Sequence, residues 1–277
     1  MPLHEAPVLS IEHLVVRYGN GCPKCQESLE KNRCTLCKSI WAANDISLDL
    51  YPGEVLGIVG ESGSGKTSLM RSLYFDFTPT SGRATLRDYE GGVGNIWGAS
   101  PAQQRMIKNK LMGMVYQNPV LGLRMDHSAA ANIAEKLIAA GNRNAGEMTE
   151  RARELLEAVE ILTSRMAEAP KHFSGGMQQR VQIAKALAMN PALLLLDEVT
   201  TGLDLSVQAR VLDLIRKIRA QFGISILLVS HDLAVIRMLA DRTIVMLDGK
   251  IVESGLTDQI LEDPQHPYTQ QLVHSLI

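Results

Sequence analysis

The chain has 277 residues, of which 45% are hydrophobic, and its 28 basic and 30 acidic side chains give a formal net charge of −2. That length suits one large α/β domain, and the near-neutral charge argues against broad binding to nucleic acid or to anionic membranes. The longest apolar runs, around residues 193–196 and 226–229, are far too short to span a bilayer. Residues 1–5 show no basic segment leading into an apolar stretch, so we expect a cytoplasmic location without export.

The order of hydrophobic patterns along the chain predicts an α/β fold. Short β-strands come first, a predominantly helical middle follows, and alternating strands and helices complete the chain. An Asp-Gly pair at Asp248 and Gly249 predicts a hairpin turn. The expected strands are residues 8–17, 46–50, 55–59, 83–87, 111–116, 193–196, 224–230, 243–247 and 250–253, and the expected helices include residues 67–74, 129–140, 147–159 and 233–239.

All four cysteines fall in one short stretch, as Cys22-Pro-Lys-Cys25 and Cys34-Thr-Leu-Cys37. Two Cys-x-x-Cys pairs predict a structural zinc site, in which four thiolates close a tetrahedron around the ion. The interval between the pairs is shorter than usual, so we expect a tight β-turn there. Reduced thiols without a metal, or redox disulfides, are the alternatives. The side chains expected to balance the charge of a zinc–thiolate centre are Lys24, Lys31, Arg33 and Lys38.

A phosphate-binding pattern follows the apolar run 55–59: Gly60-Glu-Ser-Gly-Ser-Gly-Lys66-Thr67 matches G-x-x-x-x-G-K-[ST]. Glycines let the backbone curl so that its N–H groups point inward, and the N-terminus of the next helix adds positive potential. Lys66 then reaches the outer phosphates, and the Thr67 hydroxyl ligates Mg²⁺. An ordinary glycine-rich turn is the alternative, which the strand-then-helix context disfavours. The predicted nucleotide-binding residues are Gly60, Glu61, Ser62, Gly63, Ser64, Gly65, Lys66, Thr67 and Ser68.

Two adjacent carboxylates, Asp197 and Glu198, end the apolar run 193–196. Ligands of open parallel sheets sit where the strands end, so these carboxylates are candidates for Mg²⁺ binding and for polarising the attacking water, respectively. Read alone, such a pair is often only a strand meeting its turn. The phosphate loop favours the functional interpretation.

The segment Phe173-Ser174-Gly175-Gly176-Met177-Gln178-Gln179-Arg180 precedes a helix with apolar residues on one side. By itself it is typical of a helix cap with a flexible lead-in. Ser-Gly-Gly-x-Gln placed about twenty residues before the Asp-Glu strand resembles the signature sequence of ATP-binding cassette (ABC) ATPases. The resemblance extends from about residue 9 to the C-terminus, with all motifs in the family's order.

The resemblance implies a P-loop NTPase fold of the ABC ATPase type, with a mixed central sheet, an N-terminal antiparallel β subdomain and a helical subdomain at 118–173. We expect one ATP-binding domain over 1–277, with the cysteine segment 20–41 as an insert where the family has only a short turn. The family works with ATP and Mg²⁺. The resemblance also implies a head-to-tail homodimer, or pairing with another ABC ATPase subunit.

The resemblance also implies a role for each residue that matches a motif of the family. Tyr18 stacks on adenine, Gln117 senses Mg²⁺ and the γ-phosphate, and His231 contacts the γ-phosphate. The implied catalytic residues are Glu198, His231 and Gln117, and the implied Mg²⁺ contacts are Thr67, Gln117 and Asp197. The residues that contact the ATP of the partner subunit are Ser174, Gly175, Gly176, Met177 and Gln178. The inter-subunit loop contains Asp204.

Each of these weaker positions has a plainer interpretation. Tyr18 is also typical of a strand end, Gln117 of a polar turn before Asn-Pro, and His231 of the start of a helix. Their order around two stronger motifs favours the functional roles. One departure concerns Val199, which stands where the family usually has proline after the catalytic Glu. Proline fixes φ and lacks an N–H, so valine loosens that turn, and we expect hydrolysis to survive.

Two groups of ABC ATPases share features with this chain: the ATPase pair of oligopeptide importers, and the ATP-binding subunit of the bacterial phosphonate carbon–phosphorus lyase system. The tail from Asp263 to Thr269 fits both. Gln117-Asn-Pro-Val-Leu-Gly-Leu-Arg124, followed by Ser128-Ala-Ala-Ala-Asn132-Ile133, resembles the lyase subunit more. We therefore expect an ATPase docked on soluble lyase-core proteins through the region 118–135. The alternative partner is a membrane permease, and no nucleic-acid partner is expected.

Overall fold

The computed structural model describes residues 5–274, and residues 1–4, which contributed to the expectation about export, lie outside this range. The chain forms two compact units: unit 1 comprises the residues up to Ser100 and from Leu227 onward, and unit 2 comprises Pro101–Ile226. The division falls within strand β9 (Ser225–Val229). Among the described helices, none is long and apolar enough to cross a membrane.

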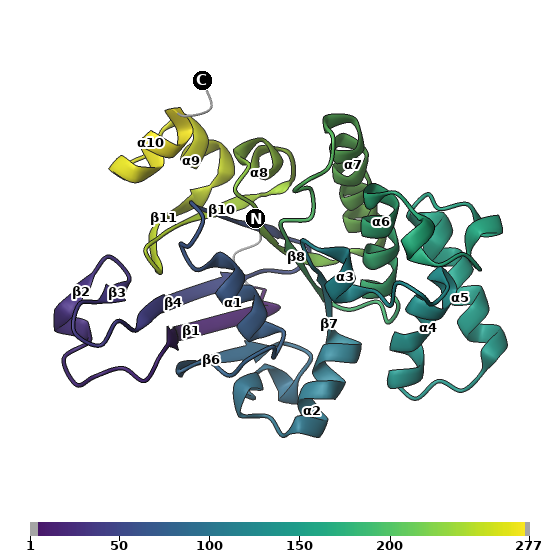
Figure 1. Cartoon of the computed structure of the whole chain (residues 1–277), viewed down its shortest axis with the longest axis horizontal. Coiled ribbons are helices and arrows are strands. Elements are labelled where there is room, and N and C mark those ends of the chain that lie inside the picture. Colours follow the sequence, from purple (N-terminus) through teal and green to yellow (C-terminus); the bar gives the residue numbers. More distant parts are fainter. Residues whose placement is uncertain (1–4, 275–277) are drawn as a thin grey trace. The chain divides into compact units, whose positions relative to one another are not determined.

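Unit 1 contains an antiparallel sheet and a mostly parallel one (Figure 1). The antiparallel sheet has the strand order β2-β3-β4-β1-β6, and the other follows β11-β10-β5-β9. The elements are β1 (Leu9–Tyr18), η1 (Gln26–Ser28), β2 (Leu29–Glu30), β3 (Arg33–Cys34), β4 (Ile40–Leu50), β5 (Val55–Val59), α1 (Lys66–Leu73), β6 (Ser81–Leu86), η2 (Glu90–Gly92), η3 (Ile96–Gly98), α8 (Leu233–Leu239), β10 (Arg242–Leu247), β11 (Lys250–Leu256), α9 (Thr257–Glu262) and α10 (Pro267–His274).

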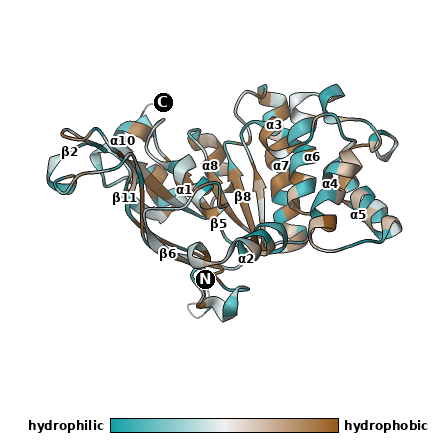
Figure 2. Cartoon of the chain, turned by 60° about the horizontal axis from the view of Figure 1, so that its bottom comes forward, coloured by the Kyte–Doolittle hydropathy of each residue, from teal (hydrophilic) through white to brown (hydrophobic). Residues whose placement is uncertain are grey.

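Every residue of β5 is buried, as expected for a parallel strand covered on both faces, and it pairs in parallel with β10. Strands β5 and β8 are both coloured as hydrophobic in Figure 2. The hairpin predicted from Asp-Gly joins β10 to β11: Asp248 has φ 48° and Gly249 has φ 78°, the two positive values that a tight hairpin turn requires.

Unit 2 is mainly helical around the parallel pair β7–β8, with the first residues of β9 continuing the strand order beside β8. Asn144 and Asp204 begin two of its helices as N-caps, because their side chains accept the otherwise unpaired N–H groups of the first turn. The elements are α2 (Pro101–Met106), a π-helix at Ile107–Leu111, β7 (Met112–Val115), α3 (Pro119–Gly122), α4 (Ala129–Ala139), α5 (Ala145–Ala158), η5 (Thr163–Arg165), η6 (Pro170–His172), α6 (Gly175–Ala186), β8 (Leu193–Asp197) and α7 (Leu205–Phe222).

The expected α/β class with an antiparallel N-terminal sheet is confirmed, and two local differences stand out. Strand β4 begins at Ile40 rather than at residue 46, because its first residues pair with β1, and Ile40 also pairs with Arg33 of β3. Helix α2 and the following π-helix were not predicted. Helix α2 has only six residues, none of them buried, so no apolar stripe marks it in the sequence.

Helices α6 and α7 approach so closely that one glycine is required between them. A Cβ on Gly176 would lie 2.2 Å from Cγ1 of Val207, whereas a Cβ on Gly175 would meet its nearest neighbour, Leu203, at 3.6 Å. Valine is stiff about χ1 and cannot easily move aside. Gly176 is therefore needed for packing in addition to any role in the signature sequence.

We expect Gly176→Ala to lower the free energy of unfolding by about 1–3 kcal/mol through overpacking. Urea unfolding followed by circular dichroism measures this change. Gly175→Ala is the matched control, since its new methyl group has ordinary contact distances. Equal stabilities of the two variants would contradict the proposed packing constraint.

Candidate nucleotide site and cysteine cluster

The phosphate-binding loop of unit 1 connects β5 to α1, as predicted. Three of its glycines have positive φ: Gly60 at 156°, Gly63 at 85° and Gly65 at 104°. The latter two lie in the left-handed region that other residues rarely adopt. The backbone thus curls before the N-terminus of α1, the arrangement that presents N–H groups to an anion.

Backbone from two other segments lies directly against this loop. A Cβ on Gly60 would lie 2.1 Å from the carbonyl oxygen of Met246, and one on Gly65 would lie 1.7 Å from that of Ala42. The N–H of Gly249 donates to the carbonyl of Ser64 at 3.1 Å. Glycine is required at Gly60 and Gly65 because no side chain fits between these backbones.

Lys66 is buried within the loop that it follows. Its ammonium group donates to the carbonyl oxygens of Gly60 at 2.7 Å and Glu61 at 2.8 Å, and it reaches the Ser64 hydroxyl at 3.4 Å. The next residue, Thr67, lies exposed in the first turn of α1. A cation and a hydroxyl are therefore held at the place where the sequence pattern predicted phosphate and Mg²⁺ binding.

Tyr18 ends strand β1 with 45% of its surface exposed. Its hydroxyl lies 3.1 Å from that of Ser68 on helix α1, and its ring meets Phe77 edge-on at 5.8 Å between centroids. The aromatic residue predicted to stack on adenine is thus fixed beside the helix that follows the phosphate loop. Its exposed ring leaves a surface for a base.

His231 lies exposed after β9, within unit 1. The adjacent residues perform the local capping: Asp232 accepts from the N–H of Ala234 at 2.8 Å, and Ser230 accepts from the N–H of Asp232 at 3.0 Å. Asp232 is therefore the N-cap of α8, and His231 lies one residue before it, at the start of that helix.

In unit 2, the predicted sensor and the predicted base are in contact. The Gln117 amide donates to Oε2 of Glu198 at 3.3 Å, and the Thr201 hydroxyl donates to the same oxygen at 3.3 Å. Glu198 has φ 48°, a left-handed backbone that is uncommon outside glycine and is often found at functional sites. Asp197, just before it, is buried at the end of β8. Val199, at the position usually held by proline, is buried as well.

Two buried glutamines that sequence reasoning missed hold Gln117 in place. Gln182 accepts from the N–H of Tyr116 at 2.7 Å and donates to the carbonyl of Tyr116 at 3.0 Å, while Gln179 donates to the carbonyl of Gln117 at 3.2 Å. The two amides also bond to each other at 2.7 Å. Polar residues within the apolar side of a helix were the available signal, since buried amides need such partners.

The signature segment forms the start of α6. Ser174 is its N-cap and accepts from the N–H of Met177 at 3.4 Å. The Gln178 amide donates to the carbonyls of Pro170 at 3.0 Å and Phe173 at 3.1 Å. Gln178 therefore fixes the approach to the helix, while Ser174 and Gly175 lie exposed at its tip.

Asp204 is the N-cap of α7, accepting from the N–H of Val207 at 3.0 Å and from the Ser206 hydroxyl at 2.7 Å. These bonds lower the pKa of Asp204, with the Ser206 hydroxyl contributing most. Asp204 is exposed, as the expected inter-subunit loop requires.

The four cysteines lie together in unit 1, with all their Sγ atoms within 4.8 Å of one another, and none forms a disulfide. The Sγ separations are 3.8 Å for Cys22–Cys34, 3.6 Å for Cys22–Cys25 and 3.4 Å for Cys25–Cys37. The predicted tight turn is present, because β2 and β3 form a two-residue hairpin. Cys25 and Cys34 pack with Trp41 in a small apolar cluster.

The surroundings of the thiols are polar on one side. The Ser39 hydroxyl lies 2.6 Å from the Cys37 sulfur, and this hydrogen bond is the main reason that the pKa of Cys37 is lowered to about 6. Partial burial raises the pKa of Cys22 to about 12. The predicted basic residues around the cluster are all exposed.

Comparison with known proteins agrees with these observations. The family described as ABC transporter matches residues 43–201. A solved structure titled as the dimeric, post-hydrolysis state of the ATP-binding cassette MJ0796 bound to ADP and Pi superposes with a TM-score of 0.75 at 26% identity, covering 90% of this chain and 98% of that one.

Among curated relatives, the putative phosphonates utilization ATP-binding protein PhnK of Escherichia coli K12 is 49% identical over 234 residues, covering 84% of this chain and 91% of its own length. A putative peptide import ATP-binding protein of Brucella melitensis is 38% identical over 253 residues, covering 87% of this chain and 74% of its own. The oligopeptide transport ATP-binding protein OppF of Bacillus subtilis is 35% identical over 239 residues, covering 86% and 77%. The chain belongs to the ABC transporter family and is an ABC-type ATPase.

Proposed function

We propose that this chain is the ATP-hydrolysing subunit of a carbon–phosphorus lyase complex that breaks down organophosphonates, and that it acts in the cytoplasm. The 49% identity to a phosphonates utilization protein supports this role over peptide import, for which the identities are 35–38%. The observation that carries the catalytic part is the 3.3 Å contact between Gln117 and Glu198. The alternative function is the ATPase of an oligopeptide importer.

Nucleotide binding is assigned to unit 1. The phosphate loop from Gly60 to Ser68 surrounds the phosphates with backbone N–H groups, and the ammonium of Lys66 exchanges its carbonyl contacts for phosphate oxygens. Tyr18 holds adenine against its exposed ring. His231 contacts the γ-phosphate.

Hydrolysis is assigned to the carboxylates of unit 2. Glu198 removes a proton from the attacking water, and Gln117 orients that water through the amide that already contacts Glu198. Oxygen donors suited to Mg²⁺ are the Thr67 hydroxyl, the Gln117 amide and the Asp197 carboxylate, and the ion neutralises charge on the phosphates when bound.

The signature residues act on the nucleotide of a second subunit. Within its own chain, Ser174 and Gly175 are exposed at the N-terminus of α6, whose dipole favours an anion. A head-to-tail pair, either a homodimer or two related ABC ATPases, places each such helix tip over the partner's phosphates. Asp204 lies in the loop expected to cross between the subunits.

The lyase core docks at α3 and the start of α4. Val120 and Leu121 on α3 are 58% and 70% exposed, and Arg124 lies exposed beside them in an ion pair with Glu135 at 3.3 Å. Adjacent exposed apolar side chains next to a charged pair resemble the composition of a protein interface. ATP-driven movement of this unit then transmits the nucleotide state to the core by population shift.

The four cysteines bind one structural Zn²⁺. In a tetrahedron with zinc–sulfur bonds of about 2.3 Å, neighbouring sulfurs are about 3.8 Å apart, which is close to the three measured separations. Ser39 donates to the Cys37 sulfur, as an outer-shell partner of a metal-bound thiolate does. All four positions of the ion are filled by protein, so the site is structural.

The first prediction of this proposed function separates ATP binding from ATP hydrolysis. Lys66→Ala removes the cation from the phosphate loop and should abolish most ATP affinity. Glu198→Gln removes the base and should lower turnover by about 100-fold while ATP still binds. It should also trap an ATP-bound dimer, detected by size-exclusion chromatography with light scattering in the presence of Mg²⁺.

Two outcomes contradict these assignments. Equal turnover of wild type and Glu198→Gln removes Glu198 from the mechanism. A Glu198→Gln variant that stays monomeric with ATP and Mg²⁺, even with its partner proteins present, removes the support for composite sites.

The second prediction concerns the biological role. A strain lacking this chain should fail to grow on an alkylphosphonate as sole phosphorus source, yet grow normally on phosphate. Leu121→Asp should reproduce the defect by weakening docking, while basal ATPase activity stays near the wild-type value. Leu162→Asp is the matched control, since Leu162 is 71% exposed elsewhere in unit 2. Normal growth on phosphonate together with loss of peptide uptake would establish the importer function instead.

The third prediction concerns zinc. The purified chain should contain close to one zinc ion per molecule by elemental analysis, and removing it should unfold the segment 20–41 locally, because its own apolar cluster is small. Hydrogen exchange localises the unfolding. Metal-free protein with four freely titratable thiols would reject the site, and iron in place of zinc would correct its identity.

A further inference from the structure

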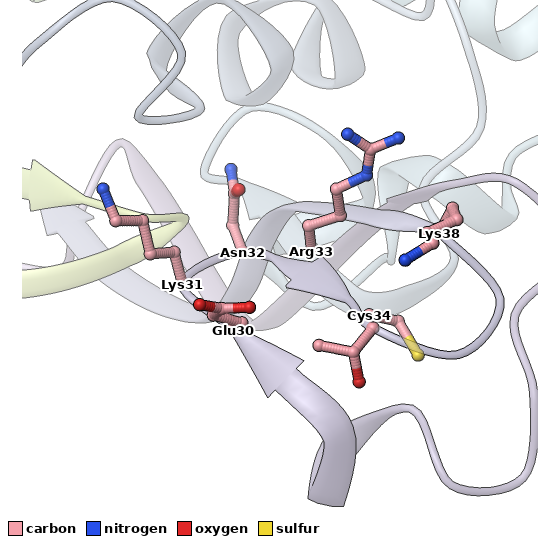
Figure 3. A pocket seen from close by; sticks show the side chains of 7 residues that line it. Glu30, Lys31, Asn32, Arg33, Cys34 and Lys38 are labelled. Carbon is pink, nitrogen blue, oxygen red and sulfur yellow. The ribbon is translucent and has the colours of Figure 1, made fainter.

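The hairpin turn of the cysteine insert (residues 20–41) contacts the phosphate loop. The hairpin pairs Leu29 with Cys34 and Glu30 with Arg33, which leaves Lys31 and Asn32 as the turn. Figure 3 shows Asn32 and Arg33 projecting from one side of this hairpin and Cys34 from the other. Arg33 and Cys34 are successive residues of β3, so their side chains lie on opposite sides of the hairpin, whereas Asn32 belongs to the turn.

Asn32 connects the turn to two parts of the nucleotide site. Its side-chain amide donates to the carbonyl of Gly63 in the phosphate loop at 3.4 Å. Its backbone carbonyl accepts from the N–H of Trp41 at 2.7 Å, and Trp41 is also the apolar partner of Cys25 and Cys34. One residue thus contacts the loop that binds phosphate and the strand against which the cysteines pack.

Strand β4 links these contacts to the other side of the phosphate loop, at Gly65. Trp41 is followed by Ala42, whose carbonyl oxygen lies so close to Gly65 that a Cβ there would approach it to 1.7 Å. The Trp41 carbonyl would likewise lie 2.4 Å from a Cβ on Gly249. A shift of the first residues of β4 therefore changes the space available to the phosphate loop.

Two buried side-chain donors lie on β1 and β4, the strands on either side of the cysteine segment. The Nε of Arg17 and the Nε1 of Trp41 are buried, and within the described residues neither has a hydrogen-bond partner. The Arg17 guanidinium lies 5.8 Å from the centre of the Trp41 ring, and it fills the space that a side chain on Gly21 would occupy. Buried donors without acceptors are costly, and a doubly negative zinc–thiolate centre, if bound by the four cysteines, would offset that cost electrostatically.

We propose that the zinc-bound insert is a brace for the phosphate loop, in which Asn32 is a positioning residue and metal occupancy raises the affinity for ATP. The metal fixes the position of the hairpin so that the Asn32 amide contacts the carbonyl of Gly63. Strand β4 restricts Gly65 through the carbonyl of Ala42. This proposal rests on the proposed assignment of nucleotide binding to the phosphate loop. It adds a dependence on metal that the ATP-binding motifs alone do not have.

The test compares ATP affinity with and without zinc in the full-length protein. Chelation should raise the Kd for ATP by about 3- to 10-fold, the effect of losing one or two hydrogen bonds, and adding back Zn²⁺ should restore it. Cys25→Ser should behave like the chelated protein. The reversible chelation arm remains informative if this variant folds poorly.

Asn32→Ala tests the contact itself. It should keep one zinc per chain, raise the KM for ATP about 2- to 5-fold and leave kcat unchanged, because it alters the loop and not the hydrolytic residues. Gln26→Ala is the matched control, since it removes an exposed amide from the same insert and should change neither value.

The outcomes separate the brace from the underlying function. Equal ATP affinity with and without zinc, or an Asn32→Ala variant with unchanged KM, would overturn the brace while leaving ATP binding intact. Zinc-loaded wild-type protein that binds no ATP would overturn the proposed nucleotide site and the brace together.

Discussion

Unit 1 depends on the contact of three backbone segments with no side chains between them. The phosphate loop, the start of β4 and the turn between β10 and β11 meet where Gly60, Gly65 and Gly249 each leave no room for a Cβ. Nearby carbonyls, including those of Ala42 and Met246, limit the paths the loop can take. The curvature that directs its N–H groups toward a phosphate is therefore imposed by packing from outside the loop as much as by its own glycines.

Unit 2 relies on a different device, a buried hydrogen-bond network. Gln179 and Gln182 lie on α6, the helix that begins with the signature sequence, and they hold the backbone that carries Gln117. Gln117 in turn contacts Glu198. A displacement of α6 consequently reaches Glu198, the residue proposed to activate water, through bonds within one unit. Fully satisfied networks of this kind are rigid, so they transmit displacement rather than absorb it.

The sequence predicted those local features whose residue pattern directly requires a particular backbone conformation or ligand spacing. The glycine spacing from Gly60 to Gly65 and the Asp-Gly hairpin require particular φ values, and both occur in the structure. The gathering of the four cysteines followed from ligand spacing. Sequence reasoning failed where structure depends on contacts distant in sequence: α2 has no apolar stripe, and the contact of Asn32 with the phosphate loop leaves no local signal. Such contacts are set by how β3 pairs with β4, which no short motif encodes.

The choice of partner has the least support in the sequence, for a physical reason. The residues assigned to ATP belong to motifs of the ABC ATPase family as a whole, so they do not distinguish a lyase subunit from an importer. Val120 and Leu121 are exposed on a short helix, where any complementary apolar surface can cover them. Whether that surface is a permease helix or a soluble enzyme depends on the partner's shape. Under the proposed docking at α3, partner identity therefore depends on how well these two exposed side chains match an apolar surface of another protein.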